Sequence, residues 1–329
     1  IIIAADFGTS GVKVGLIGRD LRVLGEAFKD YPINYRAGDA VEQNPVDWWN
    51  GFRQALINLR KEFAEEMERA SALVFSAQMC GVIPASADGT PLRPCMIWLD
   101  KRSAGLIRKK MGGAPTIAGY GLYQLISSVW LTNGAPSLNG MDPPGKLMWL
   151  RDNEPEVWSK TDKLLDVKDW LIHRATGHYV TTADCANLTW MMNSRGGKAR
   201  WSPYLLKRFG VKPSQLPDIV EGTASPGGLT EEAATFLGLP KGLPVVAGSG
   251  DVCAAALGSG AIEDGALHIC LGTSAWIGGF YPGRRLSAYE SYATITSPIN
   301  NRPLLIATQE GSGACIDWLD SATGVADMH

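Results

Sequence analysis

Residues 1–13 read IIIAADFGTSGVK, and this stretch decides the fold. A β-branched, apolar run of strand length ends before Asp6, a glycine-rich turn follows, and an alternating segment continues from Val12 to Ile17. This pattern predicts a β-hairpin with a polar turn at its tip. A third strand over residues 21–28 is expected to extend the hairpin into a meander.

A long amphipathic helix is predicted to follow the meander. Pro45 and Asp47 are start signals, and large apolar residues then recur at helical spacing up to Met67. Residues 72–77 return as a short apolar strand. Three strands, a helix and another strand begin an α/β domain, and we expect its first turn to lie at the sheet edge that faces a cleft.

Length and composition indicate two domains. A chain of 329 residues exceeds one ordinary core, and 45% apolar residues with 38 glycines favour a globular α/β protein with many tight turns. We expect residues 1–241 to form the first domain, with residues 101–242 as its decoration, and residues 242–329 to begin the second.

The opening pattern recurs late in the chain. An apolar strand is expected over residues 266–270, Gly272, Thr273 and Ser274 form a turn, and residues 276–281 continue outward. Two such units indicate two related halves that face each other. Taken alone, either turn is better explained as an ordinary hairpin without a ligand.

Charge and cysteine usage exclude several classes of protein. The 31 basic and 33 acidic residues give a net charge of −2, which provides no broad positive field for nucleic acid or an anionic membrane. Six cysteines without a CxxC pair indicate reduced thiols in a cytoplasmic protein, and the four histidines form no zinc pattern.

The least polar stretch, residues 243–262, carries Asp251 and several glycines, so no membrane span is predicted. No charged leader precedes the first strand, so no signal peptide is expected.

The first turn has the groups that a polyphosphate needs. Gly8 lets the backbone approach closely, Thr9 and Ser10 add hydroxyls, and Lys13 offers a cation. Asp6 is placed to orient a hydrated Mg²⁺, which keeps several waters and takes few protein ligands. A simple turn-forming aspartate is the commoner role for such a residue, and this explanation stays open.

Asp251 follows a predicted strand over residues 244–247 and precedes a predicted helix over residues 252–257. Helix capping is its first explanation, because aspartate is among the best N-caps, worth ~1 kcal/mol. Three small residues nevertheless clear space in front of it. A carboxylate on a cleft wall can accept a hydroxyl proton during phosphoryl transfer.

A polar and aromatic cluster runs from Ser76 to Arg102 and has the groups of a polyol pocket. Amides and carboxylates pair with hydroxyls, and an aromatic face packs against the C–H side of a sugar. The alternative, of about equal weight, makes Met79 and Trp98 core residues and Arg102 a solvated partner of Asp100. The candidate substrate contacts are Gln78, Met79, Cys80, Trp98, Asp100 and Arg102.

Residues 6–13 resemble the first phosphate motif of the xylulokinase-like branch of the FGGY carbohydrate kinases. Residues 41–49 are similar to the segment that follows in that branch, and residues 141–153 have the spacing of the family's N-terminal signature. The resemblance implies an actin-like (ribonuclease H-like) ATPase fold with two domains around a cleft. It also implies a kinase that uses ATP and Mg²⁺ to phosphorylate a sugar hydroxyl, on a ketose such as a pentulose or on a polyol.

The same resemblance assigns roles to particular residues. Asp251 takes the position of the general base, close to the substrate and to the metal near Asp6. Gln78, Met79 and Gly81 fit the substrate loop. The positions on the nucleotide side are Gly272, Thr273, Ser274, Gly313 and Asp317.

Two positions depart from the xylulokinase pattern. Cys80 stands where the branch usually has His, and Val252 stands where Asn follows the base. Both are sugar-contact positions, so the resemblance does not name xylulose as the substrate. Family members run well beyond residue 329, so the second domain is expected to be incomplete.

Two other functions are compatible with these features. An actin-like ATPase that moves or binds proteins would keep the phosphate turns but does not need the 78–102 pocket. A non-catalytic sugar-binding relative is suggested by Cys80 and Val252. We expect a small-molecule sugar or polyol partner, with no nucleic acid and no membrane, and leave a homodimer open.

Overall fold

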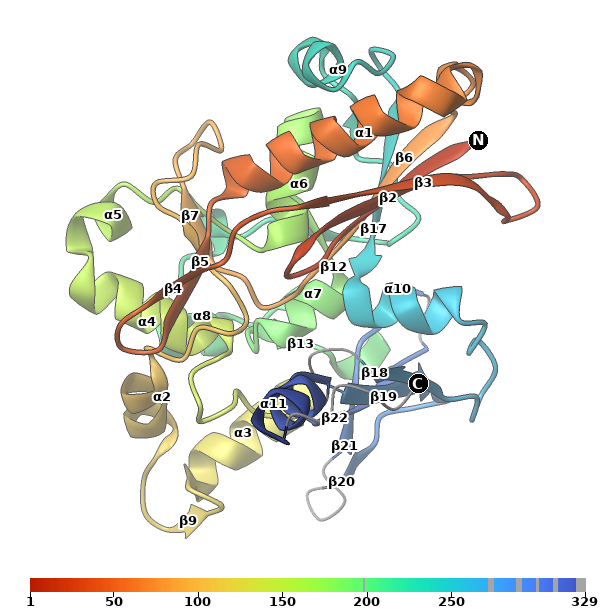
Figure 1. Ribbon diagram of the computed structural model, residues 1–329. Coiled ribbons are helices and arrows are strands. Elements are labelled where there is room, and N and C mark those ends of the chain that lie inside the picture. The colour runs from red at the N-terminus through yellow and green to blue at the C-terminus, as the bar shows by residue number, and fades with distance from the viewer. Residues whose placement is uncertain (198, 272–274, 288–291, 300–301, 310–312, 324–329) are drawn as a thin grey trace.

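The computed structural model describes residues 1–197, 199–271, 275–287, 292–299, 302–309 and 313–323. A six-stranded sheet forms the centre of the molecule, in the order β16-β17-β6-β1-β2-β3 (Figure 1). β1 pairs antiparallel with β2 and parallel with β6, and β6 pairs parallel with β17. The six strands are β1 (Ile2–Phe7), β2 (Gly11–Ile17), β3 (Val23–Asp30), β6 (Ala72–Ala77), β16 (Gly227–Gly228) and β17 (Pro244–Gly250).

The predicted meander is confirmed. The alternation of buried and exposed residues along β1 shows which face of the sheet is covered. Ile3, Ala5 and Phe7 are buried, whereas Asp6 is exposed on the opposite face. The buried face packs against α1 (Pro45–Glu68), where the rings of Phe7 and Phe52 meet edge to face at 5.7 Å. One face of the sheet is therefore closed by α1, and the other face is free for a site.

Helix α1 is the helix predicted from its start signals. The side chain of Asn44 caps it by accepting the N–H of Val46, and Pro45 occupies the first turn. Helices α6 (Val167–Thr176) and α9 (Glu231–Leu237) lie beside α1 over the same face (Figure 1). The rings of Trp48 and Trp170 join α1 to α6 at 6.3 Å.

The middle of the chain adds a helical layer with a hydrophobic core of its own. This layer holds α2 (Ala104–Met111), α3 (Leu122–Thr132), α4 (Pro143–Asn153), α5 (Pro155–Ser159), α7 (Ala183–Leu188) and α8 (Pro203–Phe209). The short strands of this part of the chain pair with one another in small sheets of two or three strands. They are β4 (Asn34–Arg36), β5 (Ala40–Gln43), β7 (Ile83–Ala85), β8 (Cys95–Met96), β9 (Thr116–Ile117), β10 (Tyr120–Gly121), β11 (Lys163–Leu165), β12 (Val180–Thr182), β13 (Met192–Asn193), β14 (Arg200–Trp201) and β15 (Asp218–Val220).

A second, antiparallel sheet follows α10 (Asp251–Gly258), in the order β18-β19-β22-β21-β20. Its strands are β18 (His268–Leu271), β19 (Ala275–Phe280), β20 (Leu286–Ser287), β21 (Tyr292–Ile295) and β22 (Leu304–Gln309). The two strands predicted around the late Gly-Thr-Ser turn are thus present. The turn itself, residues 272–274, lies outside the described residues.

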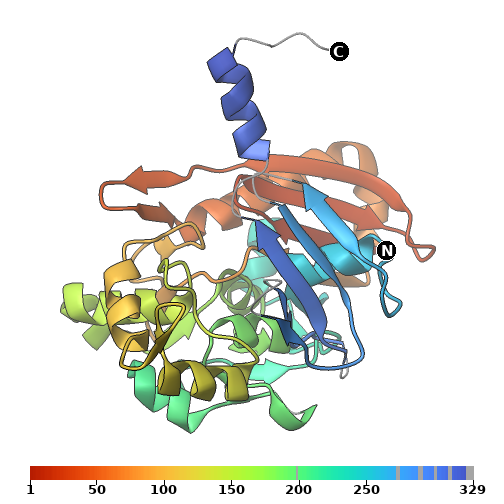
Figure 2. The same ribbon diagram turned by 90° about the horizontal axis from the view of Figure 1, so that it is seen from below.

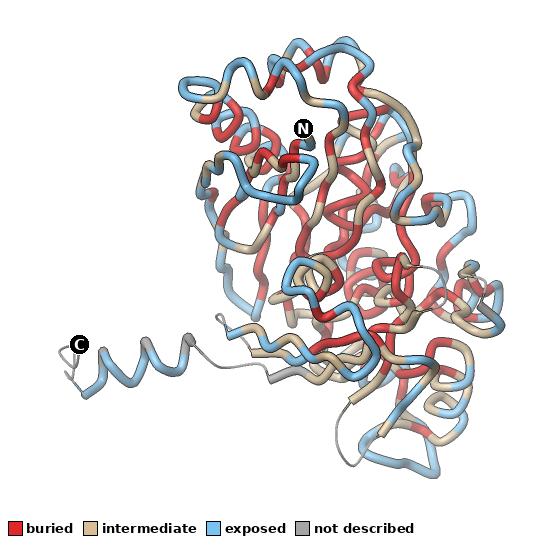
Figure 3. Tube along the Cα trace, turned by 90° about the vertical axis from the view of Figure 1, so that its right-hand side faces the viewer, coloured by how far each residue is buried: buried red, intermediate tan, exposed pale blue. Residues whose placement is uncertain are grey.

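Helix α11 (Gly313–Thr323) stands away from the body, as Figures 2 and 3 show. Figure 3 also shows that burial concentrates in the central sheet. β17 starts after the domain boundary expected at residue 242, yet it pairs inside the central sheet. The division at this boundary stays a prediction. In the described part of the chain, no helix is both long enough and apolar enough to cross a bilayer.

Candidate active site

A pocket of about 570 Å³ lies on the face of the central sheet opposite α1. Its lining comes from β1, β2, β3, β6, the end of β17, the first two turns of α10 and the loop residues 222–223 and 298–299. Three residues singled out in the sequence, Asp6, Lys13 and Asp251, all line it. The fold therefore joins the first turn region and the start of α10 at one surface.

Asp6 and Lys13 are direct cross-strand partners in the β1–β2 hairpin. Both side chains point to the pocket face because that face alternates with the buried one. Although Asp6 is exposed toward the pocket, the protein atoms around its carboxyl displace part of the water and raise its pKa, and the Ser76 hydroxyl and the Lys13 cation act in the opposite direction. Lys13 thus supplies a cation to an acidic pocket.

Asp251 is the first residue of α10, and the cap position falls on Gly250. Asp251 is therefore not the N-cap residue, and its Oδ1 accepts the N–H of the next residue, Val252, at 2.8 Å. Burial raises the pKa of Asp251 to about 7, and repulsion from Asp6 adds to the effect. A carboxyl with this pKa is divided between its acid and base forms near neutral pH.

A β-bulge in β17 sets the position of Asp251. The pairing with β6 shifts between Val246 and Ser249, and Gly248 adopts a left-handed φ of +67°. A Cβ at Gly248 would collide with the carbonyl oxygen of Phe75, so only glycine fits this turn. Gly248 and Ser249, at the bulge, line the pocket together with Asp251.

The first Gly-Thr-Ser turn is held by side chains from elsewhere in the chain. Trp98 Nε1 donates to the hydroxyl of Thr9 at 2.9 Å, and Gln43 Nε2 donates to the carbonyl of Thr9 at 2.8 Å. Gln78 Nε2 in turn donates to Gln43 Oε1 at 2.7 Å. Gln78 is only 2% exposed, so in this conformation its amide supports the turn through Gln43, and its substrate contact stays a prediction.

The predicted substrate loop is fixed from two sides. Cys80 adopts a left-handed φ of +63°, and the Asp166 carboxylate accepts the N–H groups of Cys80 and Gly81 at 3.2 and 2.8 Å. From the other side, Lys146 Nζ donates to the carbonyls of Cys80 and Ile97 at 2.8 and 2.7 Å. Lys146 is fully buried, so these carbonyls replace its water shell.

This loop lies close to Asp251. Burial raises the pKa of the Cys80 thiol, and the carboxylates of Asp142, Asp166 and Asp251 raise it further. Met79 fills the space over Gly250, where any Cβ would meet its sulfur. As far as the described residues define the 570 Å³ pocket, Cys80, Met79 and Trp98 do not line it, so the substrate loop borders it from the side.

Asp100 and Arg102 form a buried ion network. Arg102 Nη2 contacts Asp100 at 2.6 Å and Glu42 at 2.5 Å, and its guanidinium lies 4.7 Å from the ring of Trp149. The Asp100 side chain is fully buried, which makes the interpretation of a solvated pair wrong. Asp100 also accepts the N–H of Val41, so its oxygens are engaged, and a sugar contact from it stays a prediction.

Several residues that hold this region together were not predicted from the sequence. Lys146 was assigned only to a family signature, and Asp166, Asp184 and Ser76 were not singled out as site residues. Each is a polar residue within or beside an apolar segment, and this is the one signal that could have marked them. Of the nucleotide-side candidates, residues 272–274 lie outside the described residues, and Gly313 and Asp317 lie in α11.

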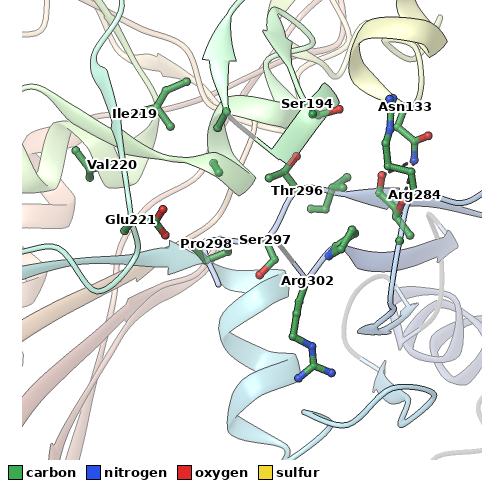
Figure 4. A pocket seen from close by; sticks show the side chains of 17 residues that line it. Asn133, Ser194, Ile219, Val220, Glu221, Arg284, Thr296, Ser297, Pro298 and Arg302 are labelled. Atoms are coloured by element: carbon green, nitrogen blue, oxygen red, sulfur yellow. Dashed lines mark hydrogen bonds between the residues drawn. The ribbon is translucent and has the colours of Figure 1, made fainter. Parts of the chain in front are cut away.

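A larger pocket of about 730 Å³ (Figure 4) shares Pro298 with the first pocket, and Asp251 is not among its lining residues. Its labelled polar residues serve mainly to join the second sheet to the body. Asn133 Nδ2 donates to the Thr294 carbonyl at 2.8 Å, and Arg284 donates to the carbonyls of Val129 and Trp130. Among the predicted site residues that the structure describes, none lines this pocket.

The fold belongs to a known class. The central sheet, the facing second sheet and the pocket between β1–β2 and α10 are those of an actin-like ATPase fold. Solved structures agree: a xyloylose kinase from Brucella ovis superposes with a TM-score of 0.86 at 25% identity, covering 98% of this chain and 63% of that one. A gluconate kinase from Lactobacillus acidophilus gives a TM-score of 0.87 at 23% identity, covering 100% and 63%.

Residues 1–258 match the model of the FGGY family of carbohydrate kinases, N-terminal domain, and the chain belongs to this family. The xylulose kinase of Escherichia coli (strain K12) is 27% identical over 330 residues, covering 99% of this chain and 64% of the relative. The gluconokinase of Bacillus subtilis (strain 168) is 27% identical over 276 residues, covering 83% and 50%. The chain thus spans between half and two thirds of the length of these relatives.

Proposed function

We propose that the protein phosphorylates a hydroxyl of a ketose or polyol with ATP, and that Asp251 is the general base. The observation that carries this proposal is the position of Asp251: its carboxyl, with a pKa of about 7, lines one pocket with Asp6 and Lys13. A base of this pKa can accept a hydroxyl proton near neutral pH. Membership of a carbohydrate kinase family supports the same reaction.

Each residue has a defined part in the proposed reaction. Asp251 accepts the proton as the substrate oxygen forms its bond to phosphorus and the bond from phosphorus to the leaving oxygen of ADP breaks. Lys13 stabilises negative charge on the transferred group. The turn at Gly8, Thr9 and Ser10 holds phosphate oxygens, and the residues 78–81 and Trp98 orient the acceptor.

The residues of the pocket fit a magnesium ion. Asp6 and Asp251 repel each other there, and the pKa values of both carboxyls are raised, so a cation near them would relieve an existing cost. Described residues contain no group of three or more protein ligands, and Mg²⁺ does not require one because it keeps waters and binds phosphate oxygens. When bound, Mg²⁺ would neutralise charge on the phosphates.

The sugar itself is proposed only as a class. Relatives are named xylulose kinase and gluconokinase, and we propose that Cys80 and Val252 help to set the specificity for one acceptor. All six cysteines are free thiols, in keeping with the cytoplasmic location that we propose. A homodimer stays a prediction.

A panel of pentuloses, hexuloses and linear polyols, assayed for ADP release by a coupled enzyme, tests this function. We expect a rate that depends on one acceptor class. ADP release that is the same with and without every acceptor would favour an ATPase acting on proteins. Calorimetry then tests the other alternative, because a non-catalytic relative should bind sugar and ignore nucleotide.

A further inference from the structure

We propose that Asp184 is a positioning residue for Asp251: it holds the backbone amide of Gly250, the residue before the base, and so fixes the direction of the Asp251 carboxylate. This inference rests on the proposed function. Asp184 lies in the first turn of α7, is fully buried, and is far from Asp251 in the sequence.

The geometry shows why a side chain is needed at this point. Because of the bulge in β17, the N–H groups of Ala247 and Gly248 are bound by the carbonyls of Ala224 and Gly222, at 2.9 and 2.8 Å. At Gly250 the acceptor is instead Asp184 Oδ2, at 2.7 Å. This is the last backbone donor before Asp251, whose own carboxylate takes the N–H of Val252.

Asp184 is itself oriented. Its Oδ1 accepts the hydroxyl of Thr182 at 2.5 Å, so one carboxylate joins the end of β12 to the end of β17. Hydrogen bonds to a carboxylate are shorter and stronger than those between neutral groups. The strand end that carries the base is also held by Lys168, whose Nζ donates to the Ala247 carbonyl at 3.1 Å.

The variant Asp184→Asn tests the inference in the intact protein. Asn keeps an acceptor for Gly250 but has no charge, so kcat should fall about tenfold because the base is held less firmly. The KM for the acceptor and the KM for ATP should stay unchanged, because Asp184 is fully buried and acts only through the strand end that carries the base. A general loss of structure would instead change kcat and both KM values together. The matched control is Asp88→Asn, which makes the same charge change in a surface turn and should leave kcat and both KM values unchanged.

The outcomes are distinct. If the unaltered protein shows no acceptor-dependent ADP release, the proposed function fails before the inference is tested. If it is active and Asp184→Asn either keeps its kcat or changes kcat and both KM values together, the positioning role is overturned. If Asp184→Asn does not fold, Thr182→Val decides: kcat about fivefold lower with unchanged acceptor KM supports the role, and an unchanged kcat overturns it.

Discussion

Trp98 and Thr9 are joined by a 2.9 Å hydrogen bond from the indole N–H to the threonine hydroxyl. Trp98 was predicted to contact the sugar, and Thr9 was predicted to contact phosphate. The contact couples the two predicted regions, because Trp98 orients a hydroxyl of the phosphate turn.

Replacement of Trp98 by Phe should weaken nucleotide binding. Phe keeps an aromatic face for the sugar but has no donor for Thr9, so we expect the KM for ATP to rise about fivefold with a smaller change in the acceptor KM. Steady-state kinetics with each substrate varied in turn measure both values. Trp130→Phe, at a largely exposed position, is the control and should change neither. An acceptor KM that rises more than the ATP KM would contradict this assignment.

Activity should depend on pH through Asp251. Its folded-state pKa is raised to about 7, and the base works only when deprotonated, so kcat/KM should be constant above that pH and fall as the pH drops below about 7. A profile measured in overlapping buffers from acid to mildly alkaline pH tests this expectation. A flat profile down to the ordinary range of an aspartate would show that Asp251 is not the titrating base.

Gly248→Ala should damage both stability and turnover. A methyl group at a φ of +67° is strained and collides with the Phe75 carbonyl, so we expect a loss of about 2–4 kcal/mol in unfolding free energy. Urea unfolding measures the loss. Gly258→Ala, at the last residue of α10 and with open space around it, is the matched control and should be neutral or stabilising by up to about 1 kcal/mol. Equal stability of the two variants would contradict the role of the bulge.

Lys146→Met should loosen the substrate loop. The change leaves the carbonyls of Cys80 and Ile97 without their donor, so we expect lower thermal stability and a KM that rises more for the acceptor than for ATP. The exposed Lys110→Met is the control. A rise confined to the ATP KM would contradict the role of Lys146 in holding the substrate loop.

Much of the fold could be predicted from local patterns. The hairpin, α1 and β6 follow from alternation and helical spacing, because each is a regular amphipathic element with its apolar side against one core. The position of β17 was harder: it joins the central sheet beside β6 through a parallel pairing that no local pattern shows. The long middle region likewise forms a core of its own, which its Pro and Gly breaks conceal.

The candidate site was predictable where a residue stands at the end of a strand, as Asp6 and Asp251 do. The residues that hold these groups were not. Lys146, Asp166 and Asp184 bind backbone groups far away in the sequence, and only the folded chain brings donor and acceptor together. Asp100 shows the opposite case, since its charge suggested a ligand contact and the structure buries it in an ion network.

Turnover of Asp251→Asn is the most direct test of the account. Asn keeps the shape of the side chain but cannot accept a proton, so acceptor-dependent ADP release should fall by about 10²–10⁴-fold while calorimetry still shows acceptor binding. Near-normal turnover in a folded Asp251→Asn protein would contradict the assignment of Asp251 as the base.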